Sequence, residues 1–308
     1  MVERSCSSLF DGADGGELCK VRETEIKGST GNYVRCERKV SHLRVFPEGT
    51  TIVLLGAGRV ATHLLPALVR GGGRVVQVWS RTLQSAQTLA APLGIPHTDR
   101  LDEVTSEADI YIACVSDGAL PALTREIVAR VARADALFVH TAGSVPMDIW
   151  NSAGAVSYGI LYPLQTFSKE RAVDLERVSF FVEGSDEASL QKVEGLAYGL
   201  SEKVYRADSS VRARLHVSAV FACNFTNAMY GVAQRLLRSG GIPFDVLLPL
   251  IDETAAKVHT LSPHDAQTGP AVRGDYTVMQ QHMESLSENP ELQRVYEQIS
   301  RLIIDDKQ

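Results

Sequence analysis

One stretch of 15 residues, 51–65 (TIVLLGAGRVATHLL), constrains the fold more than any other part of the chain. The apolar residues 52–55 are too few for a helix and predict a short buried strand. A glycine turn follows, and then apolar residues return at helical spacing. The turn has the form G-x-G-x-x-A, with Gly56, Gly58 and Ala61 at the marked positions. A strand, a glycine turn and a helix in this order predict a dinucleotide-binding unit, although the turn could also merely connect the two elements.

Each small residue of this turn has a physical role in that prediction. Gly56 permits the tight turn, Gly58 lets the backbone approach a pyrophosphate, and Ala61 lets the helix pack closely on the strand. The N-terminus of the helix offers free N–H groups and the positive end of its dipole to the phosphates. The predicted pyrophosphate-binding residues are Gly56, Ala57, Gly58, Arg59 and Val60.

The end of the second predicted strand, residues 74–79, indicates which dinucleotide is bound. NAD-binding proteins place a carboxylate there, on the ribose hydroxyls. This chain has Ser80, Arg81 and Thr82 instead. Two hydroxyls and a guanidinium suit a 2′-phosphate, so NADP is expected in preference to NAD. The alternative for Arg81 is a solvated loop charge.

Length, charge and cysteine spacing exclude several classes of protein. The 308 residues suffice for two domains, and a net charge of −6 without a basic run argues against nucleic-acid binding. The apolar stretches are too short to span a membrane. Five cysteines without C-x-x-C spacing indicate neither zinc nor a disulfide framework, which fits a cytoplasmic protein.

The order of predicted elements divides the chain into three parts. Residues 49–207 alternate strands and helices, which predicts an α/β domain with a doubly wound, mostly parallel sheet. Residues 208–308 contain no strand-like run and predict an all-helical second domain. Residues 1–48 show little periodicity and no secretory signal, so we expect a poorly ordered extension or a true translation start further downstream.

Ligands in doubly wound sheets bind beyond the carboxyl ends of the strands. The ends predicted here carry small and hydroxylated residues, as a cofactor and substrate crevice requires. We expect the nicotinamide near Val115, Ser116 and Thr141, and the substrate beside Gln165.

A long helix predicted over residues 215–238 carries the polar residues His216, Asn224 and Asn227. Steps of eight and three residues place them close to one line along an α-helix. Their neighbours are apolar or small, so the helix is expected to be buried, and buried polar groups need partners or a ligand. They are candidates for catalysis, with structural hydrogen bonding as the alternative.

A third polar cluster lies in the loop-like stretch 268–275. Thr268 could donate a hydrogen bond to a substrate, and Arg273 could bind a substrate carboxylate or pair with Asp275. His259 and His264 lie nearby, but two histidines without a third ligand make a poor metal site, so no metal is expected.

These stretches also carry a resemblance. From about residue 51 to 304 the chain resembles Rossmann-like proteins with a C-terminal domain of unknown function, which is of the 6-phosphogluconate dehydrogenase C-terminal type. The matching segments are LLGAGRVATHL, ACVSDGAL, HTAGSVP, YPLQTFS, AVFACNFTNAMY and QTGPAVRGD. The resemblance implies an NADP-type Rossmann domain, a helical domain that forms a homodimer, and a crevice between them. It also implies kinship with ketopantoate reductase, pyrroline-5-carboxylate reductase, prephenate dehydrogenase and deazaflavin-dependent NADP reductases.

One departure from those relatives affects the mechanism. The β-hydroxyacid dehydrogenases and ketopantoate reductase have a catalytic lysine on the long helix, whereas no lysine occurs between Arg212 and Arg238. His216 takes a roughly comparable place, and imidazole exchanges protons near neutrality. The sequence therefore predicts an NADP-dependent oxidoreductase for a small carbonyl or imine bound between the domains. The alternative is a non-catalytic NADP-binding redox sensor or partner-binding module.

Overall fold

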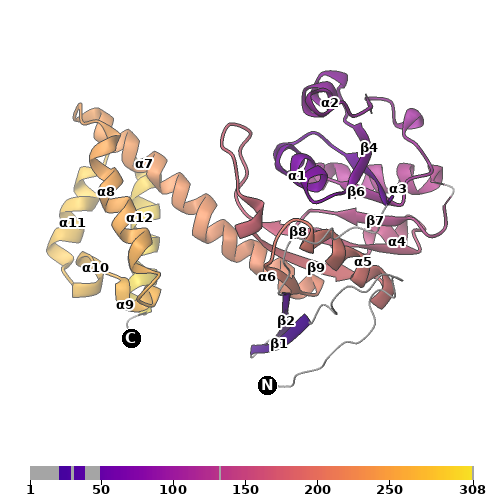
Figure 1. Ribbon diagram of the computed structural model, residues 1–308. Helices are drawn as coiled ribbons and strands as arrows, with labels where there is room; N and C mark the ends of the chain where they lie inside the picture. The colour runs from indigo at the N-terminus through magenta and orange to yellow at the C-terminus, as the bar shows by residue number, and fades with distance from the viewer. Residues whose placement is uncertain (1–20, 29–30, 39–48, 132, 307–308) are drawn as a thin grey trace. The chain divides into compact units, whose positions relative to one another are not determined.

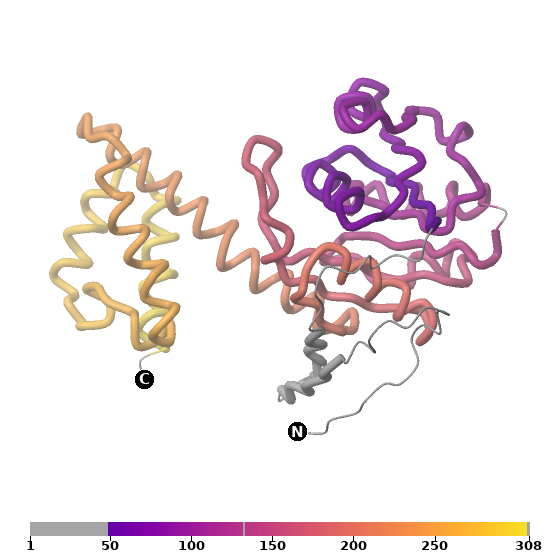
Figure 2. Tube along the Cα trace, in the orientation of Figure 1, coloured from indigo at the N-terminus to yellow at the C-terminus, as the bar shows by residue number. Residues whose placement is uncertain are grey.

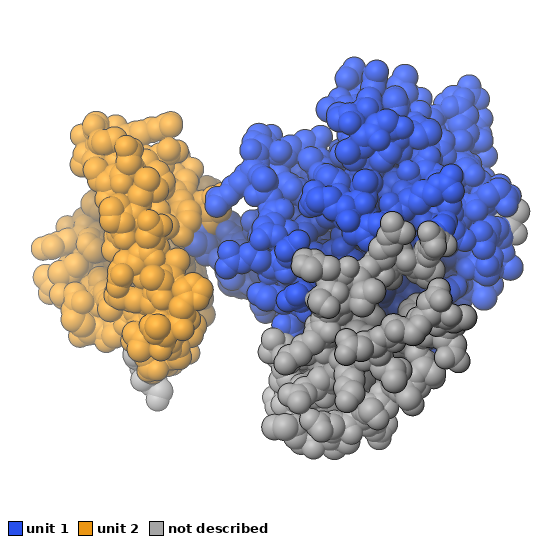
Figure 3. Space-filling view, in the orientation of Figure 1, with its two compact units in different colours: residues 1–226 blue, residues 227–308 orange. Residues whose placement is uncertain are grey.

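The computed structural model describes residues 21–28, 31–38, 49–131 and 133–306. The chain forms two compact units, Met1–Thr226 and Asn227–Gln308, shown in different colours in Figure 3. The domain boundary expected from sequence, between residues 207 and 208, lies earlier than this division. The chain passes from one unit to the other inside one long helical run, which can be followed in Figure 2.

A ten-stranded sheet organises the first unit, in the order β1-β2-β10-β9-β8-β7-β6-β3-β4-β5 (Figure 1). The six strands from β8 to β5 in this order are parallel, β9 is antiparallel to β8, and β10 is parallel to β9. The predicted doubly wound, mostly parallel sheet is therefore confirmed. The strands are β1 (Val21–Gly28), β2 (Gly31–Arg38), β3 (Thr51–Leu55), β4 (Arg74–Trp79), β5 (His97–Thr98), β6 (Ile110–Ala113), β7 (Leu137–His140), β8 (Ser157–Leu164), β9 (Ser179–Gly184) and β10 (Val204–Arg206).

Two of the strands lie in the N-terminal extension, where the sequence shows no strand pattern. The antiparallel pair β1 and β2 joins the sheet through β10. We expected poor order throughout residues 1–48, and the residues of this extension other than β1 and β2 lie outside the described residues. The two-residue strand β5 is also absent from the sequence prediction, because so short a strand has no periodicity.

Helices cover both faces of the sheet. Successive side chains of β3 point alternately into the two cores that these helices form with the sheet. Ile52 and Leu54 pack in one core with α1 (Arg59–Arg70), α5 (Glu187–Tyr198) and the end of α2 (Leu83–Ala90). Val53 and Leu55 face the other core, with α3 (Leu120–Arg130) and α4 (Ile149–Ser152). Every residue of β3 after Thr51 is fully buried, which explains its uninterrupted apolar sequence.

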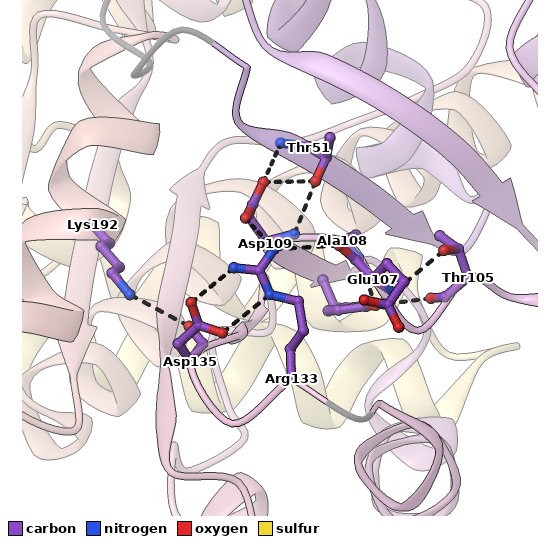
Figure 4. Close-up of polar contacts among 9 residues, drawn as sticks. Thr51, Thr105, Glu107, Ala108, Asp109, Arg133, Asp135 and Lys192 are labelled. Carbon is purple, nitrogen blue, oxygen red and sulfur yellow. Dashed lines mark hydrogen bonds and ion pairs between the residues drawn. The ribbon is translucent and has the colours of Figure 1, made fainter.

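The amino ends of β3 and β6 are joined by a polar network (Figure 4). One carboxylate oxygen of Asp109 accepts hydrogen bonds from the backbone N–H and the hydroxyl of Thr51, each at 2.7 Å. Arg133 pairs with Asp109 at 2.7 Å and with Asp135 at 2.8 Å. Burial opposes ionisation of Asp109, but the Thr51 hydrogen bonds and the Arg133 charge outweigh it and lower the pKa of the carboxyl. A shallow hollow at Thr51, Gln77 and Thr105 lies at this edge, opposite to the carboxyl ends of the strands.

The long helical run consists of three segments instead of one regular helix. An α-helix, α6 (Ser209–Ala219), passes into a π-helix, η5 (Val220–Phe225), and then into α7 (Thr226–Ser239). Asp208 starts α6 by accepting hydrogen bonds from the N–H groups of Ser210 and Val211, both at 2.8 Å. A π-turn contains one residue more than an α-turn, so it rotates the residues that follow it around the helix axis. His216 and Asn224 therefore do not share one face as they would in a regular α-helix.

The rest of the second unit is helical, as predicted. A 3₁₀ turn, η6 (Phe244–Leu247), leads into α8 (Leu248–Lys257), and α12 (Pro290–Asp305) ends the described chain. Three shorter helices lie between them in the sequence: α9 (Pro263–Ala266), α10 (Pro270–Arg273) and α11 (Tyr276–Ser285). Among the described residues, no helix is both long and apolar enough to cross a membrane.

Candidate active site

The glycine turn has the geometry of a phosphate-binding turn. Gly56 adopts a φ of +118°, which favours glycine, and its N–H donates to the carbonyl of Trp79 at 2.6 Å. Gly58 is the N-cap of the 12-residue helix α1, and no side chain caps this end. Gly58 and Arg59 are exposed, whereas Ala61 is fully buried against the core. The first N–H groups of α1 are therefore available to an anion, and the residues fit a dinucleotide pyrophosphate.

The predicted nicotinamide-side residues come together with this turn at the carboxyl ends of the strands. A Cβ on Gly56 would lie 3.1 Å from the side chain of Val115, so the turn abuts the end of β6. Thr141, after β7, donates its N–H to the carbonyl of Ala113 at 3.2 Å. Cys114 beside them is buried, which raises the pKa of its thiol to about 12 and keeps it protonated and unreactive.

The end of β4 presents the residues predicted to bind a 2′-phosphate. Ser80 is buried, and its N–H donates a hydrogen bond to the carbonyl of Thr98 at 3.2 Å. Arg81 and Thr82 are exposed. Thr82 donates its hydroxyl to Ser85 at 2.8 Å. Among the ion pairs of the described residues, none involves Arg81, so its guanidinium is available to a ligand.

The loop after β7 is fixed from two sides. Ser144 donates a hydrogen bond to Asp117, which follows β6. Nδ1 of His140 accepts a hydrogen bond from the N–H of Ala142 at 3.2 Å. The ring proton of the neutral imidazole is therefore on Nε2, which faces the carbonyl of Pro146. Burial and then the Arg212 charge lower the pKa of His140 to about 4, so this histidine is neutral and structural.

Arg212 anchors helix α6 to the same loop. Its side chain is 1% exposed and forms an ion pair with Glu183. It also donates to the carbonyl of Val145 at 2.9 Å and to the hydroxyl of Ser209 at 3.1 Å. Because residues four apart share one face of an α-helix, this anchor also sets the position of His216.

His216 contacts a tyrosine that the sequence did not single out. The hydroxyl of Tyr162, on β8, lies 3.1 Å from Nδ1 of His216. A Cβ on Gly143 would lie 2.6 Å from Cζ of Tyr162 and 2.7 Å from Nδ1 of His216. The two side chains therefore pack directly on the backbone of the loop after β7, and only glycine fits beneath them.

The remaining predicted site residues are exposed. Asn224 lies in the π-helix, and Asn227 belongs to the second unit. Gln165 follows β8, and its side-chain oxygen accepts the N–H of Thr166 at 2.7 Å. Thr268 and Arg273 lie in the second unit, and Asp275 caps α11 through the N–H of Val278 at 3.2 Å. Among the described residues no ion pair joins Arg273 to Asp275, so the structural alternative for this arginine is not seen.

Sequence reasoning missed Tyr162, Gly143 and Arg212 as members of the site. The segment YPLQTFS is among those that carry the resemblance, but nothing in it marks Tyr162 as a site residue, and this tyrosine lies inside β8, which continues to Leu164. Arg212 gives no signal in the sequence, because one arginine at a helix start is ordinary. Gly143 could have been noticed from its place after a buried strand.

This arrangement can bind a dinucleotide and exchange a proton beside it. The turn at Gly56 and Gly58 supplies backbone donors for phosphates, and the ends of β6 and β7 form the floor where a nicotinamide would lie. The Tyr162–His216 pair supplies two titratable groups next to that floor.

Comparisons with known proteins agree with this geometry. Residues 41–166 match the model for shikimate/quinate 5-dehydrogenase, and residues 178–303 match a domain of unknown function (DUF2520). The structure of a candidate NADP oxidoreductase from Bacteroides fragilis is 49% identical, with a TM-score of 0.79 over 83% of this chain and 98% of that one. The chain belongs to this family of Rossmann-fold oxidoreductases. It accordingly has an NAD(P)-binding Rossmann domain followed by a helical C-terminal region.

A more distant solved structure shares the fold, and a curated protein matches part of the sequence. An imine reductase from Myxococcus stipitatus in complex with NADP+ is 17% identical, with a TM-score of 0.57 over 83% of this chain and 92% of that one. Glucose-fructose oxidoreductase domain-containing protein 1 from Mus musculus is 27% identical over 106 residues, which are 34% of this chain. The chain spans about a quarter of the length of these curated relatives, 27% for the mouse protein.

Proposed function

We propose that this protein is an NADP-dependent oxidoreductase that transfers hydride to or from a small carbonyl or imine compound. The observation that carries the proposal is the contact of Tyr162 with His216 on the backbone of Gly143, at the strand end where a nicotinamide would lie. A module that only sensed NADP would not need a proton-exchanging pair there. The pair therefore favours an enzyme over the redox sensor.

In this proposal NADP is preferred over NAD. The exposed guanidinium of Arg81 and the hydroxyls of Ser80 and Thr82 would bind the 2′-phosphate, because arginine matches phosphate geometry. Gly56 to Val60 would bind the pyrophosphate. Val115, Ser116 and Thr141 would face the nicotinamide.

His216 is the proposed proton donor to the substrate, and bound NADPH supplies the hydride. Asn224 and Asn227 would position the substrate oxygen or nitrogen, and Gln165, Thr268 and Arg273 would contribute further contacts. A carboxylate on the substrate would suit Arg273.

We further propose a homodimer formed through the helical domain. Residues predicted to be buried on the long helical run are exposed in the single chain, with exposed fractions of 55% for Val217, 62% for Phe221 and 49% for Phe225. Within the described part of the second unit, the buried residues are Ala271 and Ser300. So little burial cannot stabilise this unit alone, and a second copy would cover its apolar faces.

The test is NADPH oxidation, followed at 340 nm, with 2-methyl-1-pyrroline as the imine probe and pyruvate as the carbonyl probe. We expect turnover of one probe by the wild type and a loss of roughly 100-fold in His216→Ala. His259→Ala, at an exposed histidine, is the matched control. Tight NADPH binding without turnover of either probe would favour the sensor, and unchanged turnover in His216→Ala would remove that residue from the mechanism.

A further inference from the structure

The contact between Tyr162 and His216 joins a phenol to one ring nitrogen of an imidazole. The side chain of Tyr162 is 8% exposed, and burial raises the pKa of its phenol above the ordinary value, although the Arg212 charge opposes this. The phenol therefore keeps its proton near neutrality and is able to donate it in a hydrogen bond. Among the described residues, the hydrogen-bond partner of this hydroxyl is His216, whose Nδ1 lies 3.1 Å from the Tyr162 oxygen.

A neutral imidazole carries one N–H and one acceptor nitrogen. If Nδ1 accepts the phenol proton, the ring proton must reside on Nε2. The hydrogen bond made by one ring nitrogen thus determines which nitrogen can give a proton to a ligand. The same logic operates wherever a third group orients a catalytic base.

The surroundings hold this arrangement in place. Gly143 leaves no room for a methyl group below the two rings, so they rest on the backbone after β7. Arg212, one turn before His216, fastens α6 to the carbonyl of Val145 in the same loop. The rings meet edge-on, with centroids 6.1 Å apart and an interplanar angle of 60°.

We propose that Tyr162 is a positioning residue for His216, fixing the tautomer in which Nε2 carries the proton that the substrate receives. The inference rests on the proposed function. As hydride adds to the substrate carbon, the C=O or C=N π bond breaks and its electron pair takes the proton from Nε2. Nδ1 takes the Tyr162 proton as Nε2 gives up its own, which leaves a transient phenolate. When water then returns a proton to Nε2, Nδ1 gives its proton back to the phenolate, so the phenol and the Nε2–H tautomer are both restored. Arg212 lies close enough to stabilise the transient phenolate charge.

The first experiment observes the tautomer directly and needs no turnover. Long-range ¹H–¹⁵N NMR spectra of ¹⁵N-histidine-labelled full-length protein at pH 7.5, with and without NADP+, are compared for wild type, Tyr162→Phe and Tyr158→Phe. His216→Gln identifies the signals of His216. Tyr158 lies on the same strand, and among the described residues the side-chain hydrogen bond of His216 is to Tyr162 and not to Tyr158, so Tyr158→Phe is the matched control.

We expect His216 to be in the Nε2–H tautomer in wild type and Tyr158→Phe, and to become a mixture of tautomers in Tyr162→Phe. An Nδ1–H tautomer in wild type, or an unchanged tautomer in Tyr162→Phe, would overturn the inference. These outcomes do not depend on whether any substrate is reduced, so they are independent of the proposed function.

The second experiment uses NADPH oxidation with whichever of the two probes the wild type reduces. In Tyr162→Phe we expect kcat to fall by about tenfold or more, with KM for NADPH and the circular dichroism spectrum unchanged. A rise in KM at unchanged kcat would indicate a role in binding only and contradict the inference. Tyr158→Phe should match the wild type in both constants.

Discussion

A methyl group on Gly56 would lie 2.6 Å from the carbonyl oxygen of Cys114, because the turn after β3 runs against the end of β6. Gly56 also has a φ of +118°, where other residues are strained. The turn can therefore be built only with glycine at this position. The equivalent methyl group on Gly58 would lie 3.6 Å from the same oxygen, which is an ordinary contact.

We expect Gly56→Ala to lower the free energy of unfolding by about 2–4 kcal/mol, the sum of backbone strain and crowding. Urea unfolding measures this as a lower midpoint at unchanged slope. Gly58→Ala is the control, and it should keep the midpoint but weaken NADPH binding, since its methyl group would stand where the pyrophosphate approaches. A wild-type midpoint in Gly56→Ala would show that the turn tolerates a side chain.

Replacing Arg81 should separate the two nicotinamide cofactors. Removal of a charge-assisted contact to a 2′-phosphate costs roughly 1.5–3 kcal/mol, so Arg81→Ala should raise the Kd for NADPH about 10- to 100-fold. NADH lacks that phosphate, and its Kd should hardly change. Calorimetric titration measures the Kd of each cofactor for the wild type and for Arg81→Ala. Arg74→Ala, an exposed arginine at the opposite end of β4, should bind both cofactors as the wild type does. Equal losses for NADPH and NADH would contradict a specific role of Arg81.

The buried His140 should make the protein sensitive to acid. Its pKa is about 4 in the folded chain, below the ordinary value near 6.5 that it regains on unfolding. The unfolded state therefore binds a proton first as the pH falls, and stability that is present above pH 6.5 is lost towards pH 4. Between pH 7 and pH 5 this group should contribute a loss of about 2 kcal/mol.

Urea unfolding at both pH values measures that loss, and His140→Gln should lack this component although it is less stable at pH 7. His259→Gln, at an exposed histidine, should behave as the wild type does. If the loss between pH 7 and pH 5 were identical in His140→Gln and wild type, His140 would not be its source.

The exposed aromatic face of the helical run should control assembly. Phe221→Lys places a charge on a side chain that is 62% exposed in the single chain and that a second copy would bury. Light scattering during size exclusion should show a dimer for wild type and a monomer for this variant. Val156→Lys is the control, since Val156 is 72% exposed but is not part of the helical run and lies directly before β8 in the sequence. A wild-type monomer would refute the proposed dimer.

The sequence by itself determined the α/β domain and the position of its phosphate-binding turn. These features are local: apolar runs at strand length, glycines at fixed spacing, and helical periodicity between them. β4 has the same limits in the structure as in the prediction, and β3 begins only one residue earlier, because its buried residues are contiguous. Ala61 and the adjacent leucines are buried as the helical spacing requires.

Only the tertiary structure decided the composition of the candidate active site. Tyr162 and His216 are 54 residues apart, and they meet because β8 lies beside β7 and because Arg212 holds α6 against the loop after β7. The exposure of Phe221 and the π-helix around Asn224 were likewise invisible to an analysis that assumed a regular, buried α-helix. Periodicity reports which face of an element is apolar. It does not report what that face meets, because contacts between distant segments depend on packing and not on spacing.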